Sequence, residues 1–109
     1  MYKIILVSLL TICPHLALAN YFCTGKVYHL GADQELSVSN GFGVHKICNL
    51  SEDKCKFWAS LLTTAKISDR SVLIYYSHPT VSGDQNNGAC KTIGDWVRPT
   101  DVPYYVQLN

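Results

Sequence analysis

The first half of the chain alternates apolar and polar residues in a way that predicts three short strands. Residues 25–30 include Val, Tyr and Leu, which suit a pleated surface. Residues 35–39 alternate with period two, as a half-buried strand does. Asn40-Gly41 is a strong hairpin signal, and apolar residues recur over 42–47. We therefore expect three antiparallel strands in this half.

A helical repeat follows these strands. Ser51 is the expected N-cap, and Glu52 and Asp53 suit the positive end of the helix dipole. The apolar residues after them recur on one helical face, and the helix is expected to end near Ile67. That face consists of Phe57, Trp58, Leu61, Leu62 and Ala65. The pattern predicts one amphipathic helix.

The second half of the chain returns to strand-like patterns. Residues 71–77 form the clearest strand, and a long polar loop follows over 78–89. Residues 93–97 predict a short strand or a bend, and residues 103–108 predict a terminal strand that starts with proline. The order of three strands, one helix and two strands predicts an α+β domain, specifically a small OB-like antiparallel β-barrel.

The first 19 residues predict a signal peptide. Lys3 supplies the positive start, an apolar run too short to span a bilayer follows, and residues 17–19 (Ala-Leu-Ala) form a cleavage motif. We expect the remainder, 20–109, to be a single secreted or periplasmic domain. A lipoprotein signal ending at Cys13 is the alternative, but Ile12 stands where a small residue is expected.

Composition and charge narrow the class of protein. Hydrophobic residues make up 48% of the chain and charged residues 16%, which excludes a disordered protein. The net charge is +1, and loss of Lys3 with the signal leaves eight basic residues against eight acidic ones. A neutral domain lacks the basic excess that nucleic-acid binding requires. A length of 109 residues excludes a multidomain enzyme.

The cysteines predict two disulfides. Loss of Cys13 with the signal leaves four of the five cysteines, and an even number in an exported domain favours disulfides. Three pairings of these four are open. We favour Cys48–Cys55, between a strand end and a first helical turn, together with Cys23–Cys90. The spacing matches no zinc motif.

No catalytic or metal-binding motif stands out, and we expect neither an enzyme nor a cofactor. The histidines His29, His45 and His78 form no zinc-protease motif, and no serine lies in a nucleophile elbow. The segment from Asp84 faintly resembles a calcium loop, but Ala89 stands where that loop needs glycine.

Tyrosines carry most of the information about binding. Tyr75-Tyr76 and Tyr104-Tyr105 are adjacent pairs within predicted strands. Neighbouring strand residues face opposite sides, so one tyrosine of each pair is expected to face the core and the other to face outward. Outward tyrosines on a neutral surface suit contacts with sugars or proteins, although they can also simply cover a small barrel.

The segment from Cys48 to Tyr76, with a cysteine, an aromatic helix and a V-L-I-Y-Y strand, resembles the B subunit of subtilase cytotoxin. Residues 90–96 (C-K-T-I-G-D-W) and 103–105 (P-Y-Y) resemble a wider group of small exported bacterial proteins. The resemblance implies an OB fold, pentamers, a cell-surface glycan as ligand and a toxin A-like subunit as partner. Tyr76 would match a glycan-contacting tyrosine. The serine loop for sialic acid has no clear counterpart in residues 20–26.

The sequence therefore predicts a secreted, non-catalytic binding domain that recognises a glycan or a partner protein. The expected ligand-binding residues are Tyr76, Ser77 and His78, together with the loop over 78–89. Two alternatives stay open. One is a structural subunit of a ring-shaped homo-oligomer, and the other is a small exported inhibitor that presents the loop between Pro79 and Cys90.

Overall fold

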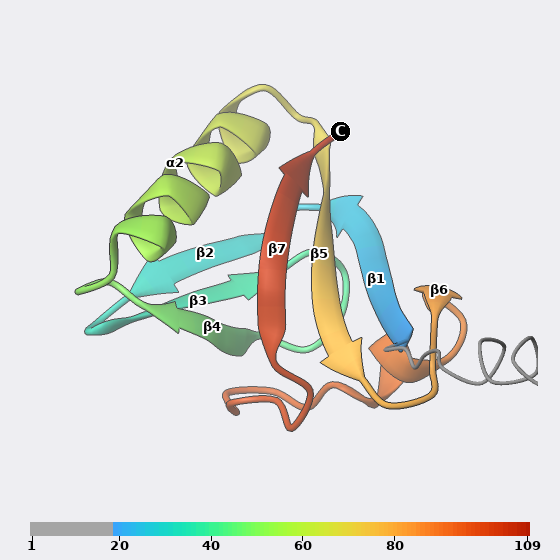
Figure 1. Ribbon diagram of the computed structural model, residues 1–109. Helices are drawn as coiled ribbons and strands as arrows, with labels where there is room; N and C mark the ends of the chain where they lie inside the picture. The colour runs from blue at the N-terminus through green and yellow to red at the C-terminus, as the bar shows by residue number, and fades with distance from the viewer. Residues whose placement is uncertain (1–18) are drawn as a thin grey trace, which may run out of the picture.

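A computed structural model describes residues 19–109 as an α+β domain with one α-helix and two sheets (Figure 1). The predicted signal peptide and Cys13 lie outside the described residues, apart from Ala19. The elements in chain order are β1 (Ala19–Lys26), β2 (His29–Ala32), β3 (Glu35–Ser39), β4 (His45–Asn49), α2 (Asp53–Ile67), β5 (Ser71–His78), β6 (Gly83–Asp84), the 3-10 helix η1 (Ala89–Thr92) and β7 (Pro103–Leu108).

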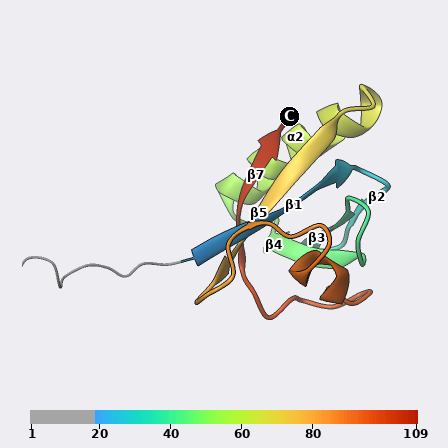
Figure 2. The ribbon, with the colours of Figure 1, turned by 90° about the vertical axis from the view of Figure 1, so that its right-hand side faces the viewer.

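The two sheets divide the strands between them. One sheet has the order β6-β1-β5-β7, and the other is the antiparallel meander β2-β3-β4. β1 pairs with β5 over its whole length, from Ala19 opposite His78 to Lys26 opposite Ser71. The helix α2 covers one end of the domain, while η1 and the segment leading to β7 lie at the opposite end (Figure 1, Figure 2). The helix therefore does not cover the loops at that opposite end, where a ligand could bind.

The prediction of a closed barrel is wrong, because the two sheets do not join into one cylinder. In residues 19–109, the strand pairing between β4 and the segment before β7 is limited to one parallel bridge, from His45 to Val97. β7 instead lies beside α2. At the other side the chain itself connects the sheets, because β1 runs into β2 across two residues and the Tyr28 N–H donates to the Ser39 carbonyl at 2.8 Å.

The predicted number of strands is also wrong at two places. Four strands precede the helix, because residues 19–26 pair with β5, about 50 positions later in the chain, and local alternation does not reveal such a partner. A two-residue strand, β6, also forms within the predicted loop by pairing with β1. Residues 93–97 form a bend rather than a strand, apart from the bridge at Val97.

The helix buries most of its predicted face. Its buried residues are Cys55, Trp58, Leu62 and Ala65. Phe57 was predicted to share this face but is 64% exposed, because it lies about 100° around the helix from Trp58. Ser51 is not the N-cap. Glu52 occupies that position without a side-chain hydrogen bond, and the Ser51 N–H donates to Oδ1 of Asn49 at 2.9 Å.

Both disulfides of the favoured pairing are present. Cys23–Cys90 joins β1 to η1 with Cα atoms 5.8 Å apart, and Cys48–Cys55 joins β4 to α2 with Cα atoms 5.6 Å apart. The first bridge spans 67 positions of sequence and the second spans seven. The long bridge fastens the loop end of the domain to the larger sheet, and the short one fastens the helix to the smaller sheet.

Candidate functional site

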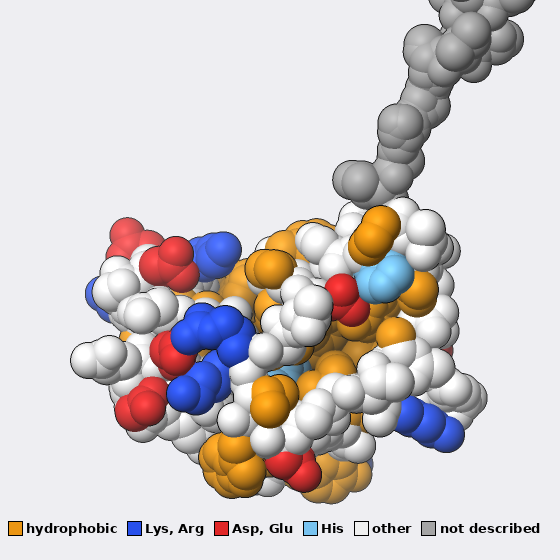
Figure 3. Space-filling model, turned by 90° about the horizontal axis from the view of Figure 1, so that it is seen from below, with side chains coloured by type: hydrophobic (Ala, Val, Ile, Leu, Met, Phe, Trp, Pro, Cys, Tyr) orange, Lys and Arg blue, Asp and Glu red, His pale blue; other side chains and the backbone are white. Residues whose placement is uncertain are grey.

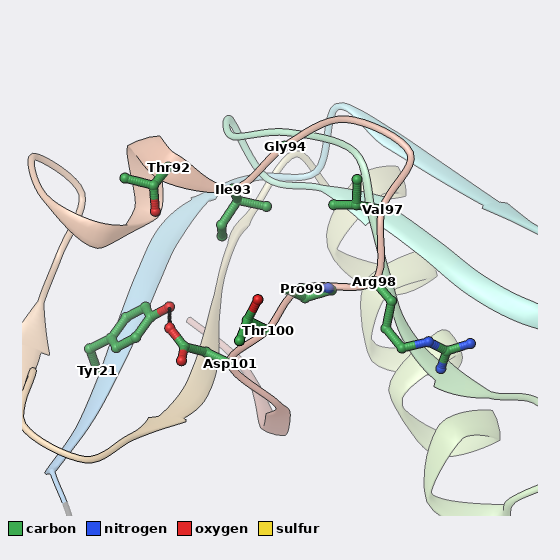
Figure 4. Close-up of a pocket in the computed structure, with 9 residues that line it drawn as sticks. All are labelled: Tyr21, Thr92, Ile93, Gly94, Val97, Arg98, Pro99, Thr100 and Asp101. Atoms are coloured by element: carbon green, nitrogen blue, oxygen red, sulfur yellow. Dashed lines mark hydrogen bonds between the residues drawn. The ribbon is translucent and has the colours of Figure 1, made fainter.

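A cavity of about 370 Å³ opens at the end of the domain opposite α2. Figure 3 shows this end from below, with a hollow that is largely apolar at its centre. We call it the Asp101 cavity. Its lining comes from β1, the end of η1 and the segment between η1 and β7, and consists of Tyr21, Thr92, Ile93, Gly94, Val97, Arg98, Pro99, Thr100 and Asp101 (Figure 4).

One wall of the cavity is a carboxylate held by a tyrosine. The Tyr21 hydroxyl donates to Oδ2 of Asp101 at 2.7 Å (Figure 4). Burial, together with the neighbouring carboxylate, raises the pKa of Tyr21, so its hydroxyl keeps its proton and donates. The Ser77 N–H donates to the Val102 carbonyl at 3.0 Å, which fixes the backbone next to Asp101. The carboxylate is therefore held in one orientation.

Two further rings support Tyr21 from the interior. Tyr21 stacks on Tyr76 with ring centroids 5.2 Å apart and an interplanar angle of 19°. Tyr76 is fully buried, and its hydroxyl lies 2.6 Å from Nε2 of His45. His45 Nδ1 lies 2.6 Å from the Gly43 carbonyl, which can only accept, so Nδ1 carries the proton and Nε2 accepts from Tyr76. We call Tyr21, Tyr76 and His45 the ring column.

The rest of the lining has both apolar and polar groups. Ile93 and Val97 supply apolar surface across the cavity from Asp101, and Thr100 supplies a hydroxyl next to Asp101 (Figure 4). The Arg98 side chain points away from the cavity (Figure 4) and pairs with Glu35 on β3, which also pairs with Lys46 at 3.5 Å. Arg98 therefore directs its charge away from the cavity, and Asp101 gives the cavity its negative charge.

Burial of His45 predicts a pH-dependent stability. Desolvation lowers the pKa of His45 below its ordinary value of 6.5. As the pH falls below about 6.5, the unfolded chain takes up a proton at this residue and the folded chain does not, so folding stability should fall over that range. Urea unfolding at pH 7 and pH 5 measures the loss.

The His45→Gln variant is the control for this pH dependence, because glutamine does not titrate there. Its stability should change less between pH 7 and pH 5 than that of the wild type. The other lowered pKa, that of Asp33, arises mainly from the Glu35 N–H that its carboxylate accepts. Asp33 therefore loses its stabilising effect only as the pH falls below about 4. An unchanged pH dependence in His45→Gln would contradict the assignment to His45.

The three predicted ligand-binding residues do not converge on one surface. Tyr76 lies in the core, so its predicted role as a surface contact is wrong. Ser77 is exposed on β5, and His78 Nδ1 accepts the N–H groups of Thr80 and Val81 at 3.1 and 3.0 Å. Tyr76 reaches the cavity only through Tyr21, and His78 packs its ring edgewise near Tyr21 at 6.1 Å.

The tyrosine pairs behave differently from each other. Tyr75 and Tyr76 face opposite sides, as predicted. Tyr104 and Tyr105 are both exposed, by 39% and 49%, because the register between β5 and β7 shifts there. Tyr75 lies opposite Tyr105, but Tyr76 lies opposite Pro103, which leaves Tyr104 as an extra bulged residue. We call Phe22, Tyr75, Tyr104 and Tyr105 the aromatic face, in which Tyr75 packs against the other three.

The predicted loop over 78–89 is fastened to the larger sheet. The Asn86 side chain accepts the Thr24 N–H at 2.9 Å and donates to the Thr24 carbonyl at 3.0 Å. Oδ1 of Asp84 accepts the Asn86 N–H at 2.9 Å. Within residues 19–109, no three histidine, cysteine or acidic side chains gather as a metal site would require. The hydrogen bond from Asn86 to Asp84 closes a turn within this segment.

Comparison with known proteins does not assign the chain to a family. No protein-family model, curated protein or solved structure matches the chain. None of the helices in the described part of the chain is long and apolar enough to cross a membrane. The function therefore has to be argued from the site itself.

Proposed function

We propose that the chain is an exported, non-catalytic binding domain that recognises a neutral saccharide in the Asp101 cavity. The observation that carries the proposal is the Asp101 carboxylate, fixed by Tyr21 at the wall of a cavity of about 370 Å³. Such a volume lies in the range of small-ligand sites. Oδ2 accepts from Tyr21, so Oδ1 is the atom offered to a ligand hydroxyl.

The mixed lining supports a sugar as the ligand. A saccharide ring presents C–H groups and hydroxyls together, and the cavity offers Ile93 and Val97 for the former and Thr100 and Asp101 for the latter. Hydrogen bonds to a charged group are about twice as strong as those between neutral groups. The negative wall disfavours an acidic sugar, in agreement with the missing serine loop for sialic acid.

The fold supports the resemblance to subtilase cytotoxin B subunits as an open variant of the OB fold. If β1 and β2 count as one bent strand, the main strands number five and α2 lies between the third and fourth, as in an OB fold. Two disulfides support export, because such bonds persist in oxidising compartments. This comparison concerns the fold and the compartment, and the ligand rests on the cavity.

The Asp101→Asn variant tests the proposal. Residues 20–109, produced with both disulfides formed, are applied to a glycan array, and the saccharide that binds best is titrated by calorimetry. Asn retains the shape and removes the charge, so affinity should fall about tenfold or more. Asp53→Asn, at an exposed position in the first turn of α2, is the matched control and should bind like the wild type. Equal affinity of Asp101→Asn and wild type would overturn the proposal.

A second candidate function is that of a subunit in a homo-oligomer. The aromatic face favours it, because Tyr104 and Tyr105 expose large apolar area on β7. Under this function a toxin A-like subunit would be the further partner that the resemblance implies. Size-exclusion chromatography with light scattering tests it. A monomer at micromolar concentration would reject the ring, and an oligomer that dissociates in Tyr105→Ser would support it.

A further inference from the structure

A second cavity, of about 390 Å³, lies beside the smaller sheet and shares no lining residue with the Asp101 cavity. We call it the Trp96 cavity. Its lining consists of His29, Gly31, Ala32, Asp33, Ser37, Lys46 and Trp96. The chain has two tryptophans, of which Trp58 is 5% exposed in the core and Trp96 is 66% exposed. The second tryptophan therefore adds little to the core.

The backbone holds Trp96 in a conformation that favours glycine. Its φ is +60°, in the left-handed region that bulky L-residues rarely adopt. Three hydrogen bonds fasten the segment to the start of β4. Val44 N–H donates to Oδ1 of Asp95 at 3.0 Å, Trp96 N–H donates to the Val44 carbonyl at 2.5 Å, and Lys46 N–H donates to the Val97 carbonyl at 2.9 Å. Trp96 therefore combines a large, exposed side chain with a strained backbone conformation.

A histidine on β2 supports the Trp96 ring. The rings of His29 and Trp96 are 5.3 Å apart and nearly perpendicular, at 85°. Gly31 leaves room for this arrangement, because a Cβ added there would lie 3.3 Å from Nε2 of His29. The indole is therefore positioned by its backbone and by one neighbour, while two thirds of its surface stays open to solvent.

The polar groups around the indole supply both hydrogen-bond acceptors and donors. Asp33 is exposed, with its Oδ1 accepting the Glu35 N–H at 2.7 Å, and Lys46 is half-buried. Lys46 Nζ also lies 3.5 Å from Glu35. A carboxylate and an ammonium group in one lining suit a ligand without net charge. A hydroxyl can both donate to a carboxylate and accept from an ammonium group.

We propose that the Trp96 cavity is a second saccharide site, separate from the Asp101 cavity. The C–H face of a neutral pyranose packs on the open face of the Trp96 indole. Its hydroxyls donate to Asp33 and accept from Lys46. A single sugar ring, which is partly apolar and partly polar, is of a size that fits a cavity of about 390 Å³.

Nuclear magnetic resonance of the oxidised protein tests the site, because the two indole N–H groups give separate signals. The probes are methyl glycosides of glucose, galactose and N-acetylglucosamine, together with lactose. At least one probe should shift the Trp96 signal while the Trp58 signal stays in place. Asp33→Asn should weaken that binding about tenfold, since a charged hydrogen bond is lost. No shift of the Trp96 signal with any of the four probes would overturn the proposal.

Two substitutions at Trp96 separate binding from stability. Trp96→Gly should abolish the binding at the Trp96 cavity and leave Tm unchanged or higher, because glycine adopts a φ of +60° freely. Trp96→Phe should retain part of the affinity. A marked fall in Tm for Trp96→Gly, with the affinity intact, would show a structural role and overturn the proposal.

The same titrations keep the two sites apart. Asp101→Asn should leave the shift of the Trp96 signal unchanged, and Trp96→Gly should leave binding at the Asp101 cavity unchanged. Calorimetry measures probe binding in the variants at Trp96, because the Trp96 signal is absent from them. Binding by calorimetry that Asp101→Asn removes and Trp96→Gly spares would assign all binding to the Asp101 cavity and would overturn the second site alone.

Discussion

Removal of the Cys23–Cys90 disulfide is expected to lower the free energy of unfolding by about 4 kcal/mol. The bridge closes a loop that spans 67 positions, so it removes much conformational entropy from the unfolded chain. A domain of about 90 residues has a small core and depends heavily on such a constraint. Guanidinium unfolding of a Cys23→Ala/Cys90→Ala variant under oxidising conditions measures the loss.

The second disulfide provides the control. Cys48 and Cys55 are separated by seven positions, so the same reasoning gives about 2.5 kcal/mol for a Cys48→Ala/Cys55→Ala variant. All four cysteines are buried, which makes the packing loss similar in the two variants. A larger loss in the Cys48→Ala/Cys55→Ala variant would contradict the explanation from loop length.

Replacement of Tyr76 by alanine is expected to cost about 3–5 kcal/mol, because it removes a large buried ring. Tyr76 stacks on Tyr21 and donates to His45, so its loss also leaves a buried histidine nitrogen without a donor. Tyr75→Ala, one residue away on the outer side of β5, should cost only about 1 kcal/mol. Chemical unfolding of the two variants compares the inner and outer faces directly.

A smaller change separates packing from hydrogen bonding at Tyr76. Tyr76→Phe keeps the ring and removes the hydroxyl, and it should cost about 1–3 kcal/mol because His45 Nε2 stays buried without a partner. If Tyr76→Ala lost glycan binding without losing stability, Tyr76 would be a surface ligand contact, as the resemblance implies, and the ring column would be wrong.

The local pattern of apolar and polar residues was sufficient to predict those elements whose structure depends on residues close together in the sequence. The period-two alternation of residues 35–39, the apolar strand-like run of residues 71–77 and the helical repeat after residue 52 correspond to β3, β5 and α2. The pairing of Cys48 with Cys55 also follows from short-range geometry, because a strand end and the next helical turn are necessarily close. Such features depend on contacts within about ten residues, which the sequence displays directly.

The candidate sites could not be predicted in this way. Tyr21 and Asp101 are 80 positions apart and meet only because β1 pairs with β5 while the segment before β7 returns to the same end. Trp96 meets His29 across a similar separation of 67 positions in sequence. The sequence shows only single residues at these sites, namely Asp101 before a terminal strand and Trp96 in a turn. Neither residue indicates by itself which distant residue it contacts.

Alternation along a strand determined that Tyr75 and Tyr76 face opposite sides, but it did not determine which one faces inward. That choice depends on the strands paired on either side, and it placed Tyr76 over His45 in the core. At β7 the register shift then broke the alternation and exposed both Tyr104 and Tyr105. The sequence by itself thus determined the strands with a local signal, the helix and the disulfide chemistry. Only the tertiary structure decided the inward faces, the open barrel and the two cavities, because these depend on contacts between distant segments.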